Sequence, residues 1–415
     1  MTDFSLRRQL TPADALIVGI GSMVGAGVFA VWAPAAAVAG SWMILSLVIA
    51  GIIALCNATS SAQLAAQHPE SGGTYVYARE RLSPFWGHVA GWGFVVGKTA
   101  SCAAMALTAG NYIWPDRSHI VATGSVLLIA VVNLGGLSRT AAVTRLLLAF
   151  AGIALLVVIA SSFLQTPPER ATLAAVIDVD TYGVLQAGGL MFFAFAGYAR
   201  IATFGEEVIN PERTIPWAIP RALGAVLALY LIIGFVVLSA DSPGQIAQTT
   251  APLDHIVASS SLSGLSPVVA IGAGIACLGV LLNLIPGVAR TILALGRRHE
   301  LPSWFAFVSP QRSLPLRAEL TVVIVVLAIV NTVSLTSAIS LSGVAVLTYY
   351  AITNAAALQL APHERRWPRW LAWIGLAGCI LLAISLQWRV VVTGVVIMMI
   401  GVLARFIALQ TQRRS

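Results

Sequence analysis

Charged residues are scarce in this sequence. Asp, Glu, Lys and Arg make up only 10% of its 415 residues, whereas hydrophobic residues make up 58%. A water-soluble domain carries roughly 25% charged residues, and the shortage here runs along the whole chain rather than falling in one segment. A soluble globular protein is therefore excluded, and lipid is the expected partner for most of the surface.

Cysteine is scarce as well. Each of the four cysteines lies within an apolar run, at Cys56, Cys102, Cys277 and Cys379. They show neither the paired spacing of a zinc cluster nor the setting of a structural disulfide. We interpret them as small core residues and expect neither a bound metal nor a cofactor.

Acidic residues are fewer than basic ones, with 16 Asp and Glu against 24 Lys and Arg and a formal net charge of +8. Such an excess can indicate nucleic acid binding. Here the basic residues fall in short loops between apolar runs, so membrane topology explains them better and no nucleic acid partner is expected. A secretory signal after Arg7 and Arg8 is the other alternative, but that apolar run is too long and many others follow it.

Apolar stretches of about 20 residues recur along the chain, and we count twelve. Backbone groups in hydrocarbon must be hydrogen-bonded within their own segment, and the short alternating strands of a barrel are missing. The predicted fold class is therefore an all-α polytopic membrane protein with twelve transmembrane helices. The expected spans are 12–39, 41–66, 84–112, 118–136, 140–164, 182–209, 217–240, 265–296, 318–335, 338–360, 370–386 and 389–408.

The positions of Lys and Arg predict the orientation. If the N-terminal tail (1–11) is cytoplasmic, the loops on the outer side of the membrane contain only three of these residues, Arg117, Arg170 and Arg389. Basic residues favour the cytoplasmic side of a membrane. We therefore expect the tails 1–11 and 409–415 in the cytoplasm and the protein in the inner or plasma membrane.

Glycine interrupts two of the expected helices. The first contains Gly19-Ile-Gly-Ser-Met-Val-Gly-Ala-Gly27, and the sixth contains Phe193-Ala-Phe-Ala-Gly-Tyr198. Glycine weakens a helix by about 1 kcal/mol per residue and leaves backbone groups free to bind a ligand. These breaks, predicted near Met23 and Ala196, fall in the first helix of each of two five-helix halves (12–164 and 182–360). That is the pattern of an inverted-repeat transporter, with 370–408 outside the repeat.

The glycines of the first helix have two other interpretations. A dinucleotide-binding turn needs G-x-G-x-x-G between a strand and a helix, whereas the spacing here is G-x-G-x-x-x-G inside a lipid-length apolar run. Gly21 and Gly25 also form a small-xxx-small pair that would let two helices pack closely. We favour an unwound binding segment and leave close packing as the alternative.

An unwound segment can bind both charges of an amino acid. Exposed N–H groups around Gly25 to Gly27 suit a carboxylate. Free carbonyls around Ile20 and Gly21, completed by those of Phe193 and Ala194, suit an ammonium group. The predicted substrate-binding residues are Ile20, Gly21, Ser22, Gly25, Ala26, Gly27, Phe193, Ala194, Phe195 and Tyr198.

Four ordered motifs resemble the amino acid, polyamine and organocation transporter family, most closely its bacterial members that are like cationic amino acid transporters. The motifs are Gly19-Ile-Gly-Ser-Met-Val-Gly-Ala-Gly-Val-Phe29, Pro69-Glu-Ser-Gly-Gly-Thr-Tyr-Val-Tyr77, Gly205-Glu-Glu-Val-Ile-Asn-Pro-Glu-Arg-Thr-Ile-Pro216 and Ala289-Arg-Thr-Ile-Leu-Ala-Leu-Gly-Arg-Arg-His-Glu-Leu-Pro302. The resemblance implies the bacterial leucine transporter fold, with five plus five inverted helices and two C-terminal helices. It also implies amino acid transport by alternating access, with proton coupling or exchange.

Within that family, Phe195 and its neighbour Phe193 would lie at an aromatic lid over the substrate, with Tyr198 a weaker candidate. The alternative is ordinary core packing, because large aromatic side chains fill membrane bundles. Carriers of cationic amino acids usually have an acidic residue where this chain has Ala199 followed by Arg200. We therefore expect small or neutral amino acids as substrates, with polyamines or cationic amino acids as the alternative.

Lys98 lies near the centre of the third expected helix, about 20 Å from either end at 1.5 Å per residue. Some family members have a lysine in the fifth helix in place of a sodium ion, where this chain has approximately Ala151. A lysine as deep as Lys98 must pair, face a watery cavity or lose its proton. We predict that Lys98 titrates during transport or replaces a coupling cation between the first, third and eighth helices. A permanently paired structural lysine is the alternative.

Glu206 and Glu207 follow the sixth helix, where a cytoplasmic gate would move. We predict that they act in gating together with Phe195, with Arg79 or Arg290 as an ion-pair partner. The alternative is a solvated charged loop. We expect Arg200 to lie nearer the cytoplasm than Lys98. We interpret it as a structural residue that forms an ion pair with one of these glutamates.

The apolar helices do not carry the residues of a membrane-embedded enzyme. Paired carboxylates, an H-E-x-x-H helix and a Ser–His pair are all missing from them, so no enzymatic activity is expected. A sensor that binds amino acids without moving them shares the fold and the site and stays open. The sequence does not determine the amino acid, the direction of transport or the oligomeric state, and a monomer is compatible with it.

Overall fold

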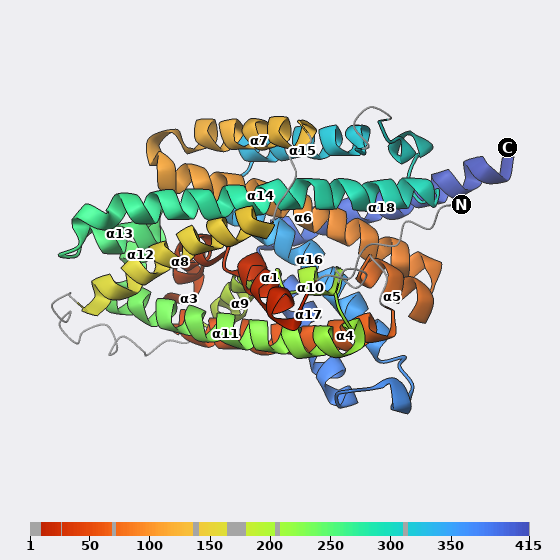
Figure 1. Ribbon diagram of the computed structural model, residues 1–415, viewed down its shortest axis with the longest axis horizontal. Coiled ribbons are helices and arrows are strands. Elements are labelled where there is room, and N and C mark those ends of the chain that lie inside the picture. Colours follow the sequence, from red (N-terminus) through yellow and green to blue (C-terminus); the bar gives the residue numbers. More distant parts are fainter. Residues whose placement is uncertain are drawn as a thin grey trace.

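The computed structural model describes residues 10–25, 27–68, 72–135, 141–163, 180–203, 208–309 and 314–414. Within these ranges the chain is helical, and its β contacts are two isolated bridges, Leu10 with Val208 and Ser309 with Leu314. Long helices lie side by side along the molecule (Figure 1). The predicted all-α class is therefore confirmed.

The described residues contain nine helical stretches that are long and apolar enough to cross a membrane. Much of their surface is not covered by protein. In the stretch Trp388–Gln410, only 11% of an apolar segment of 18 residues is buried. Exposed apolar area of this extent needs lipid to cover it. The protein is a multi-pass membrane protein. The other stretches are Pro12–Ala30, Trp32–Gln67, Pro115–Leu134, Leu146–Phe163, Thr181–Ile201, Pro211–Ala240, Ser263–Arg297 and Leu335–Ala357.

The helices of the first part of the chain match the predicted spans closely, except that the first span is divided. Its three pieces are α1 (Pro12–Met23), α2 (Gly27–Ala30) and α3 (Trp32–Ala39). The other helices of this part are α4 (Met43–Gln67), α5 (Thr74–Arg81), α6 (Pro84–Ile113), α7 (Ser118–Leu134) and α8 (Ala141–Phe163).

In the second part of the chain the sixth predicted span is divided, into α9 (Thr181–Phe195) and α10 (Ala199–Thr203). The helices that follow are α11 (Pro211–Ala240), α12 (Pro243–Gln248), α13 (Pro252–Ala258), α14 (Ser266–Arg297), α15 (Leu316–Thr332), α16 (Leu335–Ala357), α17 (Arg369–Ser385) and α18 (Trp388–Arg414). Short 3-10 turns join several of them: η1 (Gly40–Trp42), η2 (Pro115–Arg117), η4 (Ser263–Leu265), η5 (Ser303–Ala306) and η6 (Pro362–Glu364).

Local sequence determines where several helices begin. The α1 helix starts with Thr11 as N-cap and Pro12 behind it, and Asp14 completes a capping box with Thr11. Ser83 accepts a hydrogen bond from the Trp86 N–H at the start of α6. Ser/Thr caps followed by proline are favourable at this position, because the first N–H groups of a helix have no partner within it.

The α6 helix lies within the bundle and packs against α7, α14, α15 and α16. Its closest approach to α16 uses small residues: a Cβ atom on Gly97 would lie 2.7 Å from Val346 Cγ2. The Ser101 and Ser342 hydroxyls bond across the same contact at 2.7 Å. On the other side of the molecule, α4 packs against α9 and α11, and α1 packs against α11.

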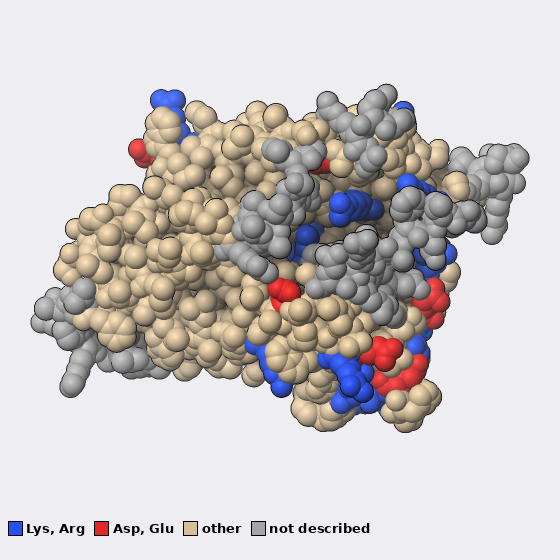
Figure 2. Space-filling view, in the orientation of Figure 1, with Lys and Arg blue, Asp and Glu red and all other residues tan. Residues whose placement is uncertain are grey.

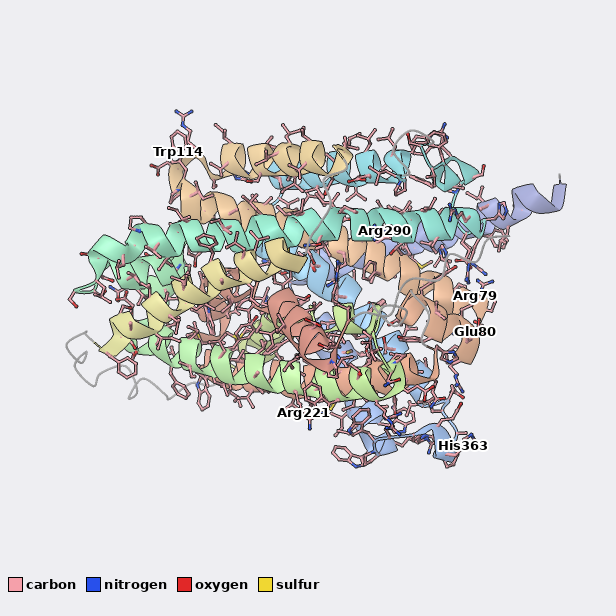
Figure 3. All side chains as sticks on the ribbon, in the orientation of Figure 1. Arg79, Glu80, Trp114, Arg221, Arg290 and His363 are labelled. Carbon is pink, nitrogen blue, oxygen red and sulfur yellow. The ribbon has the colours of Figure 1, made fainter. Side chains whose placement is uncertain are left out.

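The two ends of the bundle differ in charge. The α5 helix and the end of α18 lie at one end, and α12 and α13 lie at the other (Figure 1). Most of the charged side chains visible in Figure 2 gather at the α5 end. Arg79, Glu80 and His363 lie at that end in Figure 3, whereas Trp114 lies at the opposite one.

Candidate functional site

The first helix is interrupted where its glycines predict. The α1 helix ends at Met23, the chain bends at Val24 and Gly25, and α2 begins at Gly27. The Ile20 carbonyl still accepts the Val24 N–H at 2.8 Å, so helical bonding continues past the residue that we expected to present a free carbonyl. The Met23 carbonyl accepts a side-chain hydrogen bond instead. Ala26 lies outside the described residues.

The sixth helix is interrupted at the corresponding place. The α9 helix ends at Phe195, and a turn of Ala196 to Tyr198 leads into α10. The turn has long backbone bonds, of 3.4 Å from Ala196 N to Phe193 O and from Tyr198 N to Phe195 O. Two carbonyls here, those of Ala194 and Ala196, accept hydrogen bonds from side chains of other helices.

The two breaks contact each other through glycine. A Cβ atom on Gly197 would lie 2.8 Å from Met23 N, and one on Gly27 would lie 2.6 Å from Ala194 Cα. Any larger residue would push the two backbones apart. Glycine here therefore serves close packing as well as the break, but through Gly27 and Gly197 rather than through the small-xxx-small pair of Gly21 and Gly25.

A single tyrosine of α11 bonds to both breaks. The Tyr230 hydroxyl lies 2.6 Å from the Met23 carbonyl oxygen and 3.2 Å from that of Ala194. A hydroxyl has one proton to donate, so it can satisfy only one of these carbonyls at a time. Tyr230 is absent from the residues predicted from the sequence, although a tyrosine in the middle of an apolar span needs a partner for its hydroxyl.

Lys98 lies at the middle of α6 and bonds to the second break. Its Nζ donates to the Ala196 carbonyl oxygen at 3.1 Å, and the Tyr350 hydroxyl of α16 donates to the same oxygen at 3.2 Å. Lys98 is partly exposed and forms no ion pair with the residues that the structure describes. The contact with the sixth helix is one that we did not expect. Tyr350, like Tyr230, was missed from the sequence.

The predicted aromatic residues are buried beside these contacts. Phe195 packs its ring 5.2 Å from that of Tyr230, and Tyr198 stacks on Tyr350 at 5.1 Å. Phe193, Phe195 and Tyr198 are all buried. Phe195 and Tyr198 therefore pack against the two tyrosines whose hydroxyls bond to the breaks.

The remaining predicted residues of the first helix face in different directions. The Ser22 hydroxyl donates to the Val18 carbonyl at 2.7 Å, within its own helix. A Cβ atom on Gly21 would lie 3.4 Å from Leu148 of α8, and one on Gly25 would meet Val280 of α14. The structure therefore brings Gly27, Ser22 and Met23 to the sixth helix and directs Gly21 and Gly25 to α8 and α14.

Basic side chains of α10 and α14 lie near the sixth-helix break. Arg200 of α10 reaches α14, where its Nη1 would lie 3.7 Å from a Cβ atom on Gly287. Arg290 follows one turn later in α14 and is exposed. Figure 3 labels Arg290 at the place where Figure 2 shows basic side chains near the centre of this face. Glu206 and Glu207 lie outside the described residues.

Arg79, one of the two predicted partners of Glu206 and Glu207, pairs with Glu300. Its Nη1 lies 2.6 Å from Glu300 Oε1, and the Tyr75 hydroxyl donates to Oε2 at 2.9 Å. Burial alone would raise the pKa of Glu300, but His88 beside it, the Tyr75 hydroxyl and the Arg79 charge together lower it. This network joins α5 and α6 to the segment after α14.

A second ion pair at the same end joins α5 to η6. Arg81 donates to Glu364 through Nη1 at 2.9 Å and through Nη2 at 2.7 Å. These bonds, together with the Ala361 N–H, lower the pKa of Glu364 to about 2. The described residues contain no group of three His, Cys, Asp or Glu placed to hold a metal ion, and all four cysteines are buried and free.

Comparison with known proteins identifies the family. The sequence profile of the amino acid permeases matches residues 10–413, nearly the whole chain. The chain belongs to this amino acid permease family. It is thus a member of the amino acid, polyamine and organocation transporters, as its four motifs predicted, and it is a transporter rather than an enzyme.

Several relatives of the permease cover nearly all of it. It is 49% identical over 399 residues to an uncharacterized transporter of Mycobacterium tuberculosis, which spans 96% of this chain and 91% of that protein. It is 22% identical to the branched-chain amino acid permease of Bacillus subtilis, over 97% of this chain and 93% of that one. It is 26% identical to the chloroplastic cationic amino acid transporter 6 of Arabidopsis thaliana, over 94% and 72%.

Proposed function

We propose that the permease carries small or neutral amino acids across the plasma membrane by alternating access, with proton coupling or exchange. The observation that carries this proposal is the contact between two interrupted helices. At this contact the carbonyls of Met23, Ala194 and Ala196 bond to side chains rather than only to their own helices. Discontinuous helices that meet within a bundle are the usual binding site of this class of transporter.

The carbonyls suit the substrate ammonium group. Tyr230 supplies one proton to two acceptors, so one of the carbonyls of Met23 and Ala194 can accept a further donor. An ammonium group carries three donors in a compact arrangement. We infer that it binds between α1 and α9, close to the Tyr230 hydroxyl.

The start of α2 suits the substrate carboxylate. N–H groups at the beginning of a helical segment attract anions, and α2 begins at Gly27, shortly after the bend at Val24 and Gly25. The other predicted residues of the proposed site are Ile20, Gly21, Ser22, Phe193, Phe195 and Tyr198, of which Gly21 faces α8 rather than the sixth helix. Ile20 is the weakest member of the set, because its carbonyl accepts the Val24 N–H.

The charge around the site favours a neutral substrate side chain. Arg200 follows Ala199 and lies against α14, and Lys98 bonds to the Ala196 carbonyl of the sixth-helix break. A lysine or polyamine would bring another positive charge toward both, which is unfavourable in a medium of low dielectric constant. A cationic substrate is the second candidate, since some relatives are named cationic amino acid transporters.

We further propose twelve crossings in a five-plus-five inverted repeat, with residues 12–164 and 182–360 as the halves and 370–408 as two additional helices. Three helices, α6, α15 and α17, pack among the nine apolar stretches and would bring the crossings to twelve. The interrupted helices are then the first and the sixth. An even count agrees with cytoplasmic tails at 1–11 and 409–415.

Coupling is proposed to use Lys98. Its ammonium group bonds to the Ala196 carbonyl, so a change in its charge alters a bond made by the break itself. Gating is proposed to involve Phe195, which packs on Tyr230, and the glutamates Glu206 and Glu207.

The test is uptake of labelled alanine and leucine by proteoliposomes, with unlabelled lysine, putrescine and neutral amino acids as competitors. Saturable uptake that neutral amino acids inhibit and lysine does not would support the proposal. Stronger inhibition by lysine than by any neutral amino acid would replace it with the cationic candidate. Binding without flux would favour a sensor, so substrate-induced thermal stabilisation of the same preparation is measured in parallel.

A further inference from the structure

The strongest feature outside the transport site is a groove at the α5 end of the molecule, between α18 and the segment that follows α14. Its volume is about 430 Å³. One part of its lining is apolar and one part is polar, so that it resembles neither a core cavity nor a hydrated cleft. The apolar residues are Leu301, Pro302, Ala404, Ile407 and Ala408, and the polar ones are His299 and Ser303.

The groove borders the exposed apolar face of α18. The α18 helix is a membrane-crossing stretch, and its Leu403, Phe406 and Ile407 are each more than half exposed. Exposed Trp86 and Trp304 belong to α6 and η5 at the same end. Tryptophan favours the boundary between hydrocarbon and headgroups. The groove therefore lies at the depth where an acyl chain meets its headgroup.

An arginine beside the groove needs a counter-ion. Arg405 does not line the groove itself but follows Ala404, which does, within the apolar stretch of α18 that ends at Gln410. Its guanidinium lies 5.9 Å from the ring centre of Phe85, and its Nε is buried without a hydrogen-bond partner. Among the described residues Arg405 forms no ion pair. A charge near hydrocarbon is costly unless an anion or water satisfies it.

Further positive charge lies at the polar edge. Arg297 and Arg298 are both exposed and precede His299, which lines the groove. The acidic residue of this segment, Glu300, is buried and pairs with Arg79, so its charge is compensated. Apolar lining on one side and basic residues on the other complement a lipid with a negatively charged headgroup.

We infer that the groove binds an anionic phospholipid, with one acyl chain against Leu301, Ala404 and Ile407 and its phosphate held by Arg405 and the polar edge at His299. This site is separate from the transport site and does not depend on which amino acid is carried. Through Glu300 and Arg79 it adjoins the network that holds α5. An anionic lipid bound here would thus stabilise the α5 end of the protein.

The test uses the purified full chain in detergent, with phosphatidylglycerol or phosphatidylcholine added and the melting temperature measured. Phosphatidylglycerol should raise the melting temperature more than phosphatidylcholine does. Arg405→Gln should weaken its binding roughly fivefold, the effect of about one lost basic contact at an anionic surface. Arg405→Lys should retain most of the preference because the charge is kept.

Arg389→Gln is the matched control, because Arg389 is also an arginine of α18 that packs on an aromatic ring, at the opposite end. Ala404→Trp fills the groove without changing its charge and should abolish the preference for phosphatidylglycerol altogether. Native mass spectrometry then counts the retained lipid directly. Equal stabilisation by the two lipids, or an equal response of the Arg405→Gln and Arg389→Gln proteins, would overturn the inference.

Discussion

At the scale of residues, the Tyr230 hydroxyl is the feature that connects the two breaks of the proposed transport site most directly. It bonds to two carbonyls that lie 207 and 36 positions away in the sequence. The sequence predicted both interruptions, because glycine density is a local property. It did not predict Tyr230, Tyr350 or the partner of Lys98, because those contacts arise only when distant helices pack together.

Tyr230→Phe should lower the melting temperature of the protein without substrate. The change keeps the ring that packs on Phe195 and removes the proton donated to Met23, and a buried carbonyl left unsatisfied costs about 1–3 kcal/mol. A saturating neutral amino acid should restore part of this loss, since its ammonium group supplies donors to the same carbonyls. Thermal unfolding with and without alanine measures both effects. If Tyr230→Phe lowers the melting temperature equally in the two conditions, the substrate does not bind to the carbonyls that Tyr230 contacts.

Lys98→Met should reduce uptake driven by a pH gradient and flatten its pH dependence, because the titrating ammonium group would be gone. Lys98→Arg keeps a positive charge that does not titrate at any working pH. If Lys98 replaces a fixed cation, the arginine variant should transport; if it carries a proton, both variants should lose coupling. Proteoliposome uptake across a pH gradient gives the answer, and an unchanged rate and pH profile of Lys98→Met would remove Lys98 from the mechanism.

At the scale of elements, the paired interruptions of the first and sixth helices determine where the proposed site lies. The sequence placed both within a few residues. It also placed a free carbonyl at Ile20, which is wrong for this structure because helical bonding extends to Val24. Which carbonyl loses its helical hydrogen bond at the end of a helix depends on which side chains compete for it. Such competition is a tertiary property that glycine spacing does not contain.

Gly197→Val should abolish uptake. Its Cβ would lie 2.8 Å from Met23 N, so the two breaks would have to separate, and overpacking of this kind costs about 1–3 kcal/mol or more. Gly224→Val is the control, because Gly224 lies in α11 with open space around it. Uptake and expression of the two variants are compared. Normal uptake by the Gly197→Val protein would mean that contact between the breaks is not required for transport.

At the scale of the whole molecule, charged networks join helices that are remote in sequence at the α5 end. Arg79 and Glu300 are separated by 221 positions, and Arg81 and Glu364 by 283. The class of the fold and the approximate spans followed from hydrophobic stretches alone. These ion pairs did not, because they join residues more than 200 positions apart. The sequence offers either Arg79 or Arg290 as a partner for a glutamate after the sixth helix, whereas Arg79 pairs with Glu300 after α14.

Glu300→Gln should lower the melting temperature at neutral pH and weaken its fall in acid. The folded-state pKa of Glu300 is lowered, so its contribution to stability is complete above the unfolded pKa, near 4.5, and is lost as the pH drops through the folded value. Thermal unfolding from neutral pH to pH near 3 tests this, with exposed Glu80→Gln as the control. An identical acid slope in the wild-type and Glu300→Gln proteins would exclude the network as its source.

The burial of all four cysteines has a practical consequence. Cys56, Cys102, Cys277 and Cys379 are free thiols enclosed by helices, so a charged alkylating reagent should leave the native permease unmodified. A cysteine introduced at partly exposed Ser22 would then be the sole reactive position. The side of the bilayer from which it is labelled would report, in an otherwise native protein, which face of the permease is open at that moment.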